Sequence, residues 1–392
     1  MSHVLHFRSP ERRDLVTKLL GGRVLARDRK ASIYFRGRFV PYPFQNHLGF
    51  LPFHERLQCV AGLLAAGIED RLRTQPESQD FAAWIGRYFG GGIARHFMTP
   101  YNQKLWGVSL DQVSLDWIRA YVPQASLAAV LKSLLHTTTT AGYNSAFLYP
   151  REGGMGALIR ALDAAAGGAR CGRRAVSIDL DRRRVGFEDG QEVAYEHLVS
   201  TIPLRALGQM CTGMPTELQA DAAALRSTAM VNLTYALRRD LPVDQHWVYY
   251  PDPKFPFFRL CFPSNMNPAT APEGCALLAA EISVARGADS AALERETTAQ
   301  LHQLGLIRDL ADISFVHRVE IPYAYPVHDH GRGGRVARLR EFLRTRGIWT
   351  IGRFGQWQYS SVDDAIEWGL EAAAEICNAT SGQTEAAGVA RD

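Results

Sequence analysis

The sequence has no apolar segment long enough to cross a membrane. Its longest apolar run, residues 59–68, spans ten residues and includes two glycines, whereas a membrane helix needs about 20. The first residues do not combine a cationic start with an apolar run, so no signal peptide is expected. Six widely spaced cysteines, without a CxxC or Cys/His pair, predict reduced thiols and no metal site. We therefore expect a cytoplasmic protein without a transmembrane segment.

The short motifs of the commonest nucleotide and hydrolase sites are also missing. The sequence contains no G-x-G-x-x-G, P-loop, H-E-x-x-H or G-x-S-x-G. A dinucleotide-binding unit should carry the first of these between a strand and a helix, with an acid about 20 residues later. The nearest glycine cluster, GGMG at residues 153–156, has a different spacing. No motif of this kind predicts the function.

Lysine is scarce, because only five of the 44 basic residues are Lys. The net charge of +4 is small and scattered, which argues against nucleic acid as a partner. With 392 residues, of which 46% are hydrophobic and 21% charged, the chain has the composition of a folded protein. Its length predicts two or three domains, or one large core with an inserted part.

Helical and strand patterns alternate along the chain, which predicts a mixed α/β (α+β) fold. A helix should begin at Pro10 behind the N-cap Ser9. Further helices are expected over residues 54–135, after residue 156, and over 290–304, 335–346 and about 362–377. Strands are expected at 32–35 and 38–40 (a hairpin around Gly37), 175–180, 184–187, 191–195, 197–202, 230–237, 247–250, 257–262, 276–284, 313–321 and 348–351.

The most informative segment is near the C-terminus, where a strand leads through Gly352 and Arg353 to a helix N-terminus. Free backbone N–H groups and the helix dipole attract an anion there, and an arginine can clamp phosphate or carboxylate. An ordinary strand–turn–helix connection, with Ser360 or Ser361 as the N-cap, explains the same pattern. The residues alone leave both interpretations open.

Five segments together carry a resemblance to a known group. Residues 352–366, G-R-F-G-x-W-x-Y-x-x-V-D-D-A-I, resemble the C-terminal flavin signature of the UDP-galactopyranose mutase and amine-oxidase (protoporphyrinogen-oxidase-like) superfamily. Four other segments resemble the same group in the same order: Tyr42-Pro43, Tyr101-x-x-Lys104-x-Trp106-Gly107, Tyr149–Met155 and Pro322–Pro326. The resemblance spans about residues 3–378.

The resemblance implies a Rossmann-like FAD-binding domain, a mixed β-sheet substrate domain and a helical insert. It implies the following parts: 1–50, the remainder of the FAD domain and the start of the substrate domain; 51–140, the helical insert; 141–210, an FAD-domain segment; 211–330, the substrate-domain sheet; 331–378, the C-terminal FAD-binding segment; and 379–392, a flexible tail. The FAD domain is expected to be N-terminally truncated, since the glycine-motif βαβ unit does not occur in this sequence. A truncated reading frame, a split gene and a flavin-free descendant each explain this.

Residue roles follow from the same resemblance. The residues expected at FAD are Gly153, Gly154, Met155, Gly352, Arg353, Asp363, Asp364 and Ala365. The residues expected at the substrate are Tyr101, Lys104, Trp106, Tyr325 and Tyr359, and for the aromatic ones a place in the core is an equal alternative. The two aspartates should contact FAD through backbone N–H groups or ribityl hydroxyls. Arg259, Arg332 and Arg335 are candidates for binding a diphosphate, and no spacing selects one.

The resemblance implies an FAD-dependent oxidoreductase or mutase that acts on a small molecule. The favoured substrate is a nucleotide sugar or related metabolite of a polysaccharide or secondary pathway. The reaction would take place at flavin N5, so no catalytic side chain is predicted. The alternative is a non-catalytic or flavin-free remnant that binds a nucleotide sugar or a partner protein. The oligomeric state is not predicted.

Overall fold

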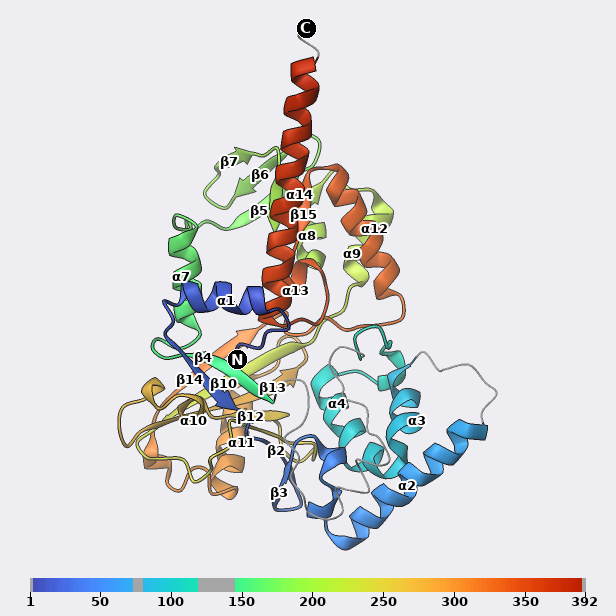
Figure 1. Cartoon of the computed structure of the whole chain (residues 1–392), viewed down its shortest axis with the longest axis vertical. Helices are drawn as coiled ribbons and strands as arrows, with labels where there is room; N and C mark the ends of the chain where they lie inside the picture. Colours follow the sequence, from blue (N-terminus) through green and yellow to red (C-terminus); the bar gives the residue numbers. More distant parts are fainter. Residues whose placement is uncertain (1–2, 73–79, 119–144, 390–392) are drawn as a thin grey trace. The chain divides into compact units, whose positions relative to one another are not determined.

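The computed structural model describes residues 3–72, 80–118 and 145–389 (Figure 1). The chain forms two compact units. Unit 1 comprises Met1–Val4, Arg23–Ala157 and Thr228–Asp329, and unit 2 comprises Leu5–Gly22, Leu158–Ser227 and His330–Asp392. Both units contain helices and strands, which confirms the mixed α/β class. No helix among the described residues is both long and apolar enough to cross a membrane.

Unit 1 is built on a seven-stranded sheet with the order β14-β10-β13-β12-β11-β2-β3. Neighbouring strands are antiparallel, except that β11 and β2 are parallel. The strands are β2 (Ala31–Phe35), β3 (Arg38–Pro41), β10 (Ala229–Leu237), β11 (Trp247–Tyr249), β12 (Arg259–Cys261), β13 (Ala276–Val284) and β14 (Ile313–Ile321). Each was expected from the sequence. The β2–β3 hairpin turns at Arg36 and Gly37, whose φ angles of 48° and 78° suit a tight turn.

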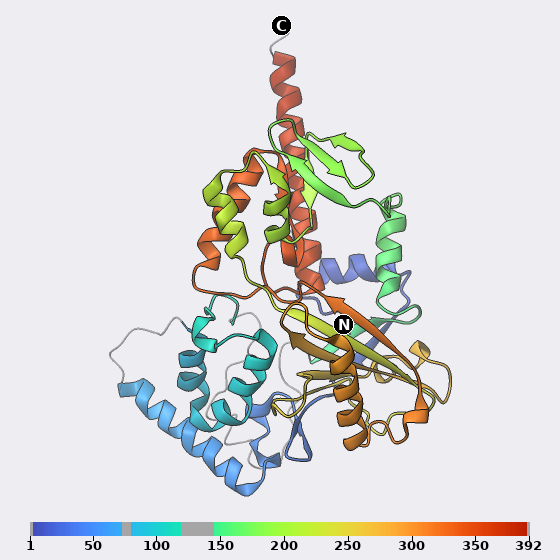
Figure 2. The same ribbon diagram turned by 180° about the vertical axis from the view of Figure 1, so that it is seen from behind.

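The two faces of this sheet carry different side chains, because successive residues of a strand point to opposite sides. On one face Val231 and Tyr235 of β10, Leu278 of β13 and Leu301 are buried in a single apolar cluster. Leu301 belongs to helix α11 (Ser290–Gln303), which lies against the sheet in Figure 2. Burial of one leucine-sized side chain contributes about 1.5–3 kcal/mol. This face therefore stabilises the sheet, and the opposite face can carry polar groups.

A two-stranded ribbon packs on the opposite face. It pairs β1 (Val24–Asp28) with β4 (Ala146–Pro150). Phe147 of β4 is buried in one cluster with Trp247 and Ala279 of the sheet. The sequence pattern does not identify β1, because its residues, VLARD, do not alternate cleanly between apolar and polar.

The helical part of unit 1 contains α2 (Phe53–Leu72), α3 (Phe81–Ile93), the π-helix η3 (Ala94–Met98) and α4 (Thr99–Trp106). It confirms the helical pattern that begins at residue 54 for α2, α3, η3 and α4, and residues 73–79 and 119–135 of that expectation lie outside the described residues. Helices α2 and α3 touch through glycine backbones. A Cβ at Gly90 would overlap the carbonyl group of Gly62, and Gly90 has a φ of 68°. Shorter elements are η1 (Phe44–Asn46), η2 (Leu48–Phe50), η4 (Leu110–Gln112), α10 (Pro263–Met266), η5 (Pro268–Thr270) and η6 (Leu310–Asp312).

Unit 2 contains two small sheets and several helices. One sheet has the order β7-β6-β5-β9, and the other pairs β15 with β8 in parallel. Its strands are β5 (Ala175–Asp179), β6 (Arg184–Phe187), β7 (Glu192–Ala194), β8 (Leu198–Ser200), β9 (Cys211–Thr212) and β15 (Ile348–Thr350). Its helices are α1 (Pro10–Leu19), most of α7 (Gly156–Ala165), α8 (Leu204–Met210), α9 (Thr216–Ala224), α12 (Arg332–Thr345), α13 (Gly352–Gly355) and α14 (Val362–Val389). Helix α14 continues past the expected end at residue 377.

The glycine contact between α2 and α3 gives a stability prediction. Replacing Gly90 by Ala should lower the free energy of unfolding by about 3 kcal/mol or more, because the new Cβ meets backbone atoms and the residue keeps a left-handed φ. Urea unfolding measures the effect. Gly86→Ala is the control, since a Cβ there meets nothing within 4 Å. Equal stability of the two variants would contradict the close helix contact.

Candidate functional site

A row of polar side chains crosses the second face of the unit 1 sheet. The strand register puts Tyr249 opposite Arg259, Arg259 opposite Glu281, and Glu281 opposite Asn232. Opposite side chains of neighbouring strands lie about 5 Å apart. These four residues therefore form a continuous series, which we call the Arg259 row.

The centre of the Arg259 row is an ion pair. Arg259 Nε donates to Glu281 Oε2 at 2.8 Å, and Arg259 Nη2 lies 2.5 Å from the same oxygen. The Glu281 side chain is fully buried, whereas that of Arg259 keeps 22% of its exposure. Within the described part of the chain, Glu281 Oε1 and Asn232 Nδ2 are buried without a hydrogen-bond partner. Because such atoms are rare in folded proteins, the row has the character of a binding surface.

Arg259 is a permanent cation that can meet a ligand. Burial would lower the pKa of Arg259, but the Glu281 carboxylate beside it holds this pKa well above its ordinary value. Glu281 engages Nε and Nη2. The other N–H groups of the guanidinium can donate to a phosphate or carboxylate that reaches this side chain, which is 22% exposed.

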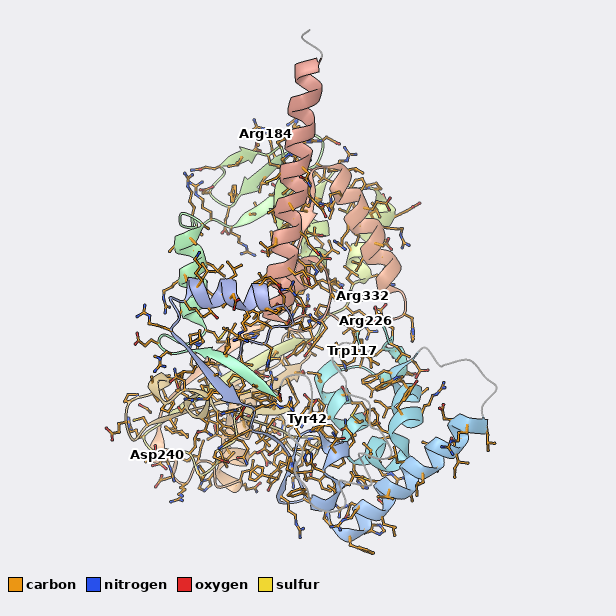
Figure 3. All side chains as sticks on the ribbon, viewed as in Figure 1. Tyr42, Trp117, Arg184, Arg226, Asp240 and Arg332 are labelled. Carbon is orange, nitrogen blue, oxygen red and sulfur yellow. The ribbon has the colours of Figure 1, made fainter. Side chains whose placement is uncertain are left out.

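Aromatic rings from three segments gather beside this row. The ring of Tyr249 lies 5.3 Å from that of Tyr42 and 5.2 Å from that of Tyr101 in α4. Trp247 Nε1 donates to the Tyr249 hydroxyl at 3.0 Å, and the Arg29 guanidinium lies 4.9 Å from the centre of the Tyr42 ring. Tyr42 is labelled in Figure 3. Such rings can stack on a planar or sugar-like group and hydrogen-bond to it through their hydroxyls.

The predicted glycine turn reaches the same face. Gly153 and Gly154 have φ angles of 69° and 57°, which glycine adopts without strain. They turn the chain from β4 into α7, so that Met155 packs against the cluster that also contacts Tyr42 and Tyr249. Met155, expected at the cofactor, thus packs against the same apolar cluster as Tyr249 of the Arg259 row.

Trp106 and Tyr325 lie together in the interior of unit 1. Their ring centroids are 6.4 Å apart, and both side chains are buried. Trp106 also meets Trp117, labelled in Figure 3, edge to face at 4.9 Å. Trp106 is therefore a core residue in this structure, and Tyr325 packs beside it.

Lys104 holds a loop rather than facing the Arg259 row. Its Nζ donates to the carbonyl oxygens of Tyr250 at 2.8 Å, Asp252 at 3.1 Å and Phe257 at 2.7 Å. Burial lowers the pKa of Lys104 to about 7. An ammonium group has three N–H donors, one for each carbonyl, so the tether is complete when the amine is protonated.

The predicted turn at Gly352 lies in unit 2, after a strand that pairs in parallel with β8. Gly352 has a φ of 73°, and a Cβ placed there would meet nothing within 4 Å. Thr350 Oγ1, at the end of β15, is buried without a partner among the described residues. A cavity of about 50 Å³ is lined by Thr350, Ile351 and Gln356 together with residues of α12 and α14, Glu371 and Glu375 among them, and Gly352 is not part of this lining. The open surroundings of Gly352 allow an anionic group, such as the diphosphate of a flavin dinucleotide, to approach the backbone.

Arg353 and Tyr359 lie together, although they were predicted for the cofactor and the substrate respectively. Arg353 Nη2 donates to the carbonyl oxygen of Ser360, and its guanidinium lies 5.6 Å from the centre of the Tyr359 ring. The guanidinium thereby fixes the segment between α13 and α14.

Asp363 and Asp364 are engaged by arginines and by a helix cap. Arg12 donates to the two oxygens of Asp363 at 2.6 and 3.0 Å, and Asp364 pairs with Arg8. Burial would raise the pKa of Asp363, but hydrogen bonds from Arg12 and from the Arg8 N–H hold it below its ordinary value. Asp364 also accepts from the Ser361 N–H at 2.6 Å. A cofactor contact through the backbone, rather than through these carboxylates, remains a prediction.

Ala365, the last residue expected at the cofactor, is exposed in the first turn of α14. Three residues of the Arg259 row, Asn232, Tyr249 and Glu281, were not singled out from the sequence. A signal was present for two of them, since Glu281 and Asn232 interrupt otherwise apolar strands, ALLAAEISV and AMVNLTYAL. Their juxtaposition with Arg259 depends on strand order, which the local pattern does not give.

Comparisons with known proteins show what this chain is similar to. The family model described as "Flavin containing amine oxidoreductase" matches residues 7–377. A reduced UDP-galactopyranose mutase is similar in structure, with a TM-score of 0.89 and 27% identity over 96% of this chain and 84% of that chain. A putative protoporphyrinogen oxidase from Exiguobacterium sp. 255-15 has a TM-score of 0.69 and 17% identity, over 95% and 90% of the two chains. Cyclohexylamine oxidase from Brevibacterium oxydans IH-35A has a TM-score of 0.65 and 16% identity, over 96% of this chain and 87% of that chain.

The position of Lys104 gives a prediction that separates a structural role from substrate binding. Replacing Lys104 by Met should lower the free energy of unfolding at pH 6 by about 2–3 kcal/mol, because three carbonyl groups lose their donor. Hydrogen exchange should increase at residues 250–257. The control is Lys30→Met, which removes an exposed pair with Asp244 and should cost under about 1 kcal/mol. A Lys104→Met variant as stable as the control but defective in ligand binding would contradict the tether.

Proposed function

We propose a function for this chain, which belongs to the flavin-containing amine oxidoreductase family. It is an FAD-dependent oxidoreductase or mutase that acts on a nucleotide sugar or a related phosphorylated metabolite. When bound, FAD supplies the redox or nucleophilic chemistry at its ring system. The side chains of the protein then have to bind, orient and shield the substrate. A cytoplasmic location is part of the proposal.

The observation that carries the proposal is the Arg259 row. A half-buried guanidinium, held by a buried carboxylate, suits the diphosphate of a nucleotide sugar, since arginine binds phosphate through paired N–H groups. The rings of Tyr42, Tyr101 and Tyr249 suit the base or the sugar. Arg259 is the only one of the three candidate arginines that lies on this sheet, so we assign the diphosphate contact to it.

The cofactor is proposed to bind through backbone groups at Gly352, with Arg353 and Tyr359 fixing the segment after Gly352. A cofactor contact at Gly153, Gly154 and Met155 stays a prediction. The same proposal divides the chain by role. Residues 141–210 and 331–378 belong to the FAD-binding part, 211–330 to the substrate sheet and 51–140 to the helical insert, with residues 1–50 shared between FAD and substrate parts and 379–392 as a tail.

Gly352 allows a direct test of the cofactor site. Gly352→Ala should weaken FAD retention on the order of tenfold, because a Cβ would occupy the open space at the backbone. The measurement is the visible flavin spectrum of the desalted protein at graded FAD concentrations. Gly168→Ala is the matched control, since Gly168 also has a positive φ and open surroundings. Equal retention by both variants would remove Gly352 from the site, and no retention by the folded parent chain would overturn the flavoenzyme proposal for this chain.

Arg259 tests the substrate class. Arg259→Lys should weaken UDP binding about tenfold or more, because lysine keeps the charge beside Glu281 but loses the planar fork. Isothermal titration with UDP gives the affinity, and the thermal midpoint checks the fold. Arg239→Lys is the control, since Arg239 is also ion-paired, with Asp312 at 3.5 Å. Undiminished UDP affinity in Arg259→Lys would contradict the assignment, whereas UDP binding without flavin would favour a nucleotide-sugar-binding protein.

A further inference from the structure

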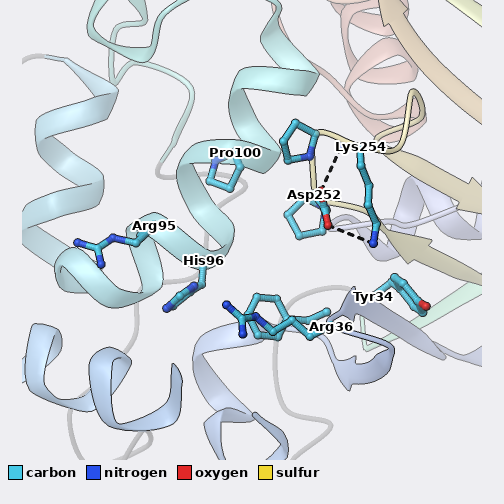
Figure 4. Close-up of a pocket in the computed structure, with 10 residues that line it drawn as sticks. Tyr34, Arg36, Arg95, His96, Pro100, Asp252 and Lys254 are labelled. Atoms are coloured by element: carbon cyan, nitrogen blue, oxygen red, sulfur yellow. Dashed lines mark hydrogen bonds and ion pairs between the residues drawn. The ribbon is translucent and has the colours of Figure 1, made fainter. Parts of the chain in front are cut away.

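A hollow of about 220 Å³ lies within unit 1 and contains no residue of the Arg259 row (Figure 4). Three elements form its walls: the β2–β3 hairpin, the π-helix η3 with the start of α4, and the loop at residues 251–254. Short π-helical segments inside longer helices occur frequently at functional sites. All lining residues belong to one compact unit, so the pocket is a property of unit 1 alone.

Positive charge dominates this pocket. Arg36, Arg95 and Lys254 line it, and Asp252 is the only acid among the lining residues. Lys254 Nζ lies 3.6 Å from Asp252 Oδ2. Arg36 Nη1 lies 2.5 Å from Glu55 Oε1. Arg95 forms no ion pair within the part of the chain that the structure describes. The pocket thus has more positive charge than its own acids neutralise.

Two of the three cations, Arg36 and Arg95, act on a shared neighbour, His96. Burial lowers the pKa of His96, and both Arg36 and Arg95 lower it further, against the opposing effect of Glu55. His96 Nε2 is 2.7 Å from Gln58 Oε1, which fixes its ring in the wall. An anion in the pocket would offset the repulsion among these groups, since opposite charge within a few ångströms favours the cationic forms.

The remaining walls are rigid. Pro100, Pro251 and Pro253 line the pocket beside Tyr34 and Phe35. Proline has few conformations to lose when a ligand binds. Lys104 holds the loop that carries Pro251 and Pro253, because its Nζ donates to the carbonyl oxygens of Tyr250 and Phe257. The pocket is therefore preformed.

We propose that this pocket binds a small phosphorylated ligand. Two arginines and a lysine suit a phosphate group, because guanidinium groups bind phosphate oxygens in pairs and a dianion matches more than one cation. The volume admits a phosphate with a small organic body, whereas pockets for larger, drug-sized ligands measure about 300–1,000 Å³. None of the lining residues belongs to the proposed FAD or nucleotide-sugar site.

The test uses pyrophosphate and inorganic phosphate as probes in isothermal titration with the full chain. Arg95→Gln and Lys254→Gln should each weaken binding about tenfold, and binding should weaken as salt is added. Arg38→Gln is the matched control, because Arg38 is an exposed arginine of the same hairpin that does not line the pocket. Thermal midpoints confirm that all variants fold.

Arg259→Lys separates this pocket from the proposed substrate site. Pyrophosphate binding that persists in Arg259→Lys and is lost in Arg95→Gln supports the pocket. Binding lost only in Arg259→Lys, or unchanged in both pocket variants, overturns it. Citrate is the third probe, and citrate affinity equal to that of pyrophosphate would overturn the assignment to phosphate. A pyrophosphate or citrate result that overturns the pocket leaves the flavin and UDP tests of the proposed function unaffected.

Discussion

The buried ion pair between Arg259 and Glu281 is the constraint on which the functional face of unit 1 depends. A carboxylate without solvent exposure is costly to bury unless a cation meets it, and loss of either partner leaves an uncompensated charge. The pair therefore requires β12 and β13 to stay in one register, since a shift by one residue would turn either side chain to the apolar face with α11. The apolar cluster on that face fixes the register of the strands. The polar face therefore holds Tyr249, Arg259, Glu281 and Asn232 in one defined arrangement.

Helix α4 shows how one short element can serve both structure and recognition. Its Lys104 and Trp106 are directed into the protein, where the amine holds three carbonyl groups and the indole packs in the core. Its Tyr101 meets Tyr249 of the Arg259 row. Positions 101 and 104 share a face of the helix and position 106 lies on another. Tyr101 and Lys104 nevertheless contact different groups, so a motif that spans these residues need not act on one ligand. The scarcity of lysine drew attention to Lys104, and the structure gives that residue a positioning role instead.

Local elements were predictable because their signals are local. Ser9-Pro10 marked the start of α1, Gly37 marked the hairpin, and alternating strands of the large sheet were recognisable individually. The strand order and the pairing of Arg259 with Glu281 were not predictable from local patterns. The two residues are 22 positions apart, and which strands become neighbours depends on the whole sheet. The pairing of Asp363 with Arg8 and Arg12 was equally inaccessible, since it joins residues more than 350 positions apart. Glu281 and Asn232, polar residues in otherwise apolar strands, carried a local signal.

The Asp363 pairing also resolves a difficulty in the flavin signature. Two aspartates at a helix N-terminus stabilise the helix but would repel a diphosphate brought near them. Arg12 and Arg8 neutralise these carboxylates within unit 2, and Ser361 N–H donates to Asp364. The turn at Gly352 can then offer its backbone to an anion without a net negative field from the signature itself. The proposed function assigns recognition of the cofactor mainly to backbone geometry, which needs glycine, and recognition of the substrate to side chains that the sheet holds in register. The two demands differ, so substitutions on the sheet can change the substrate while the flavin signature stays the same.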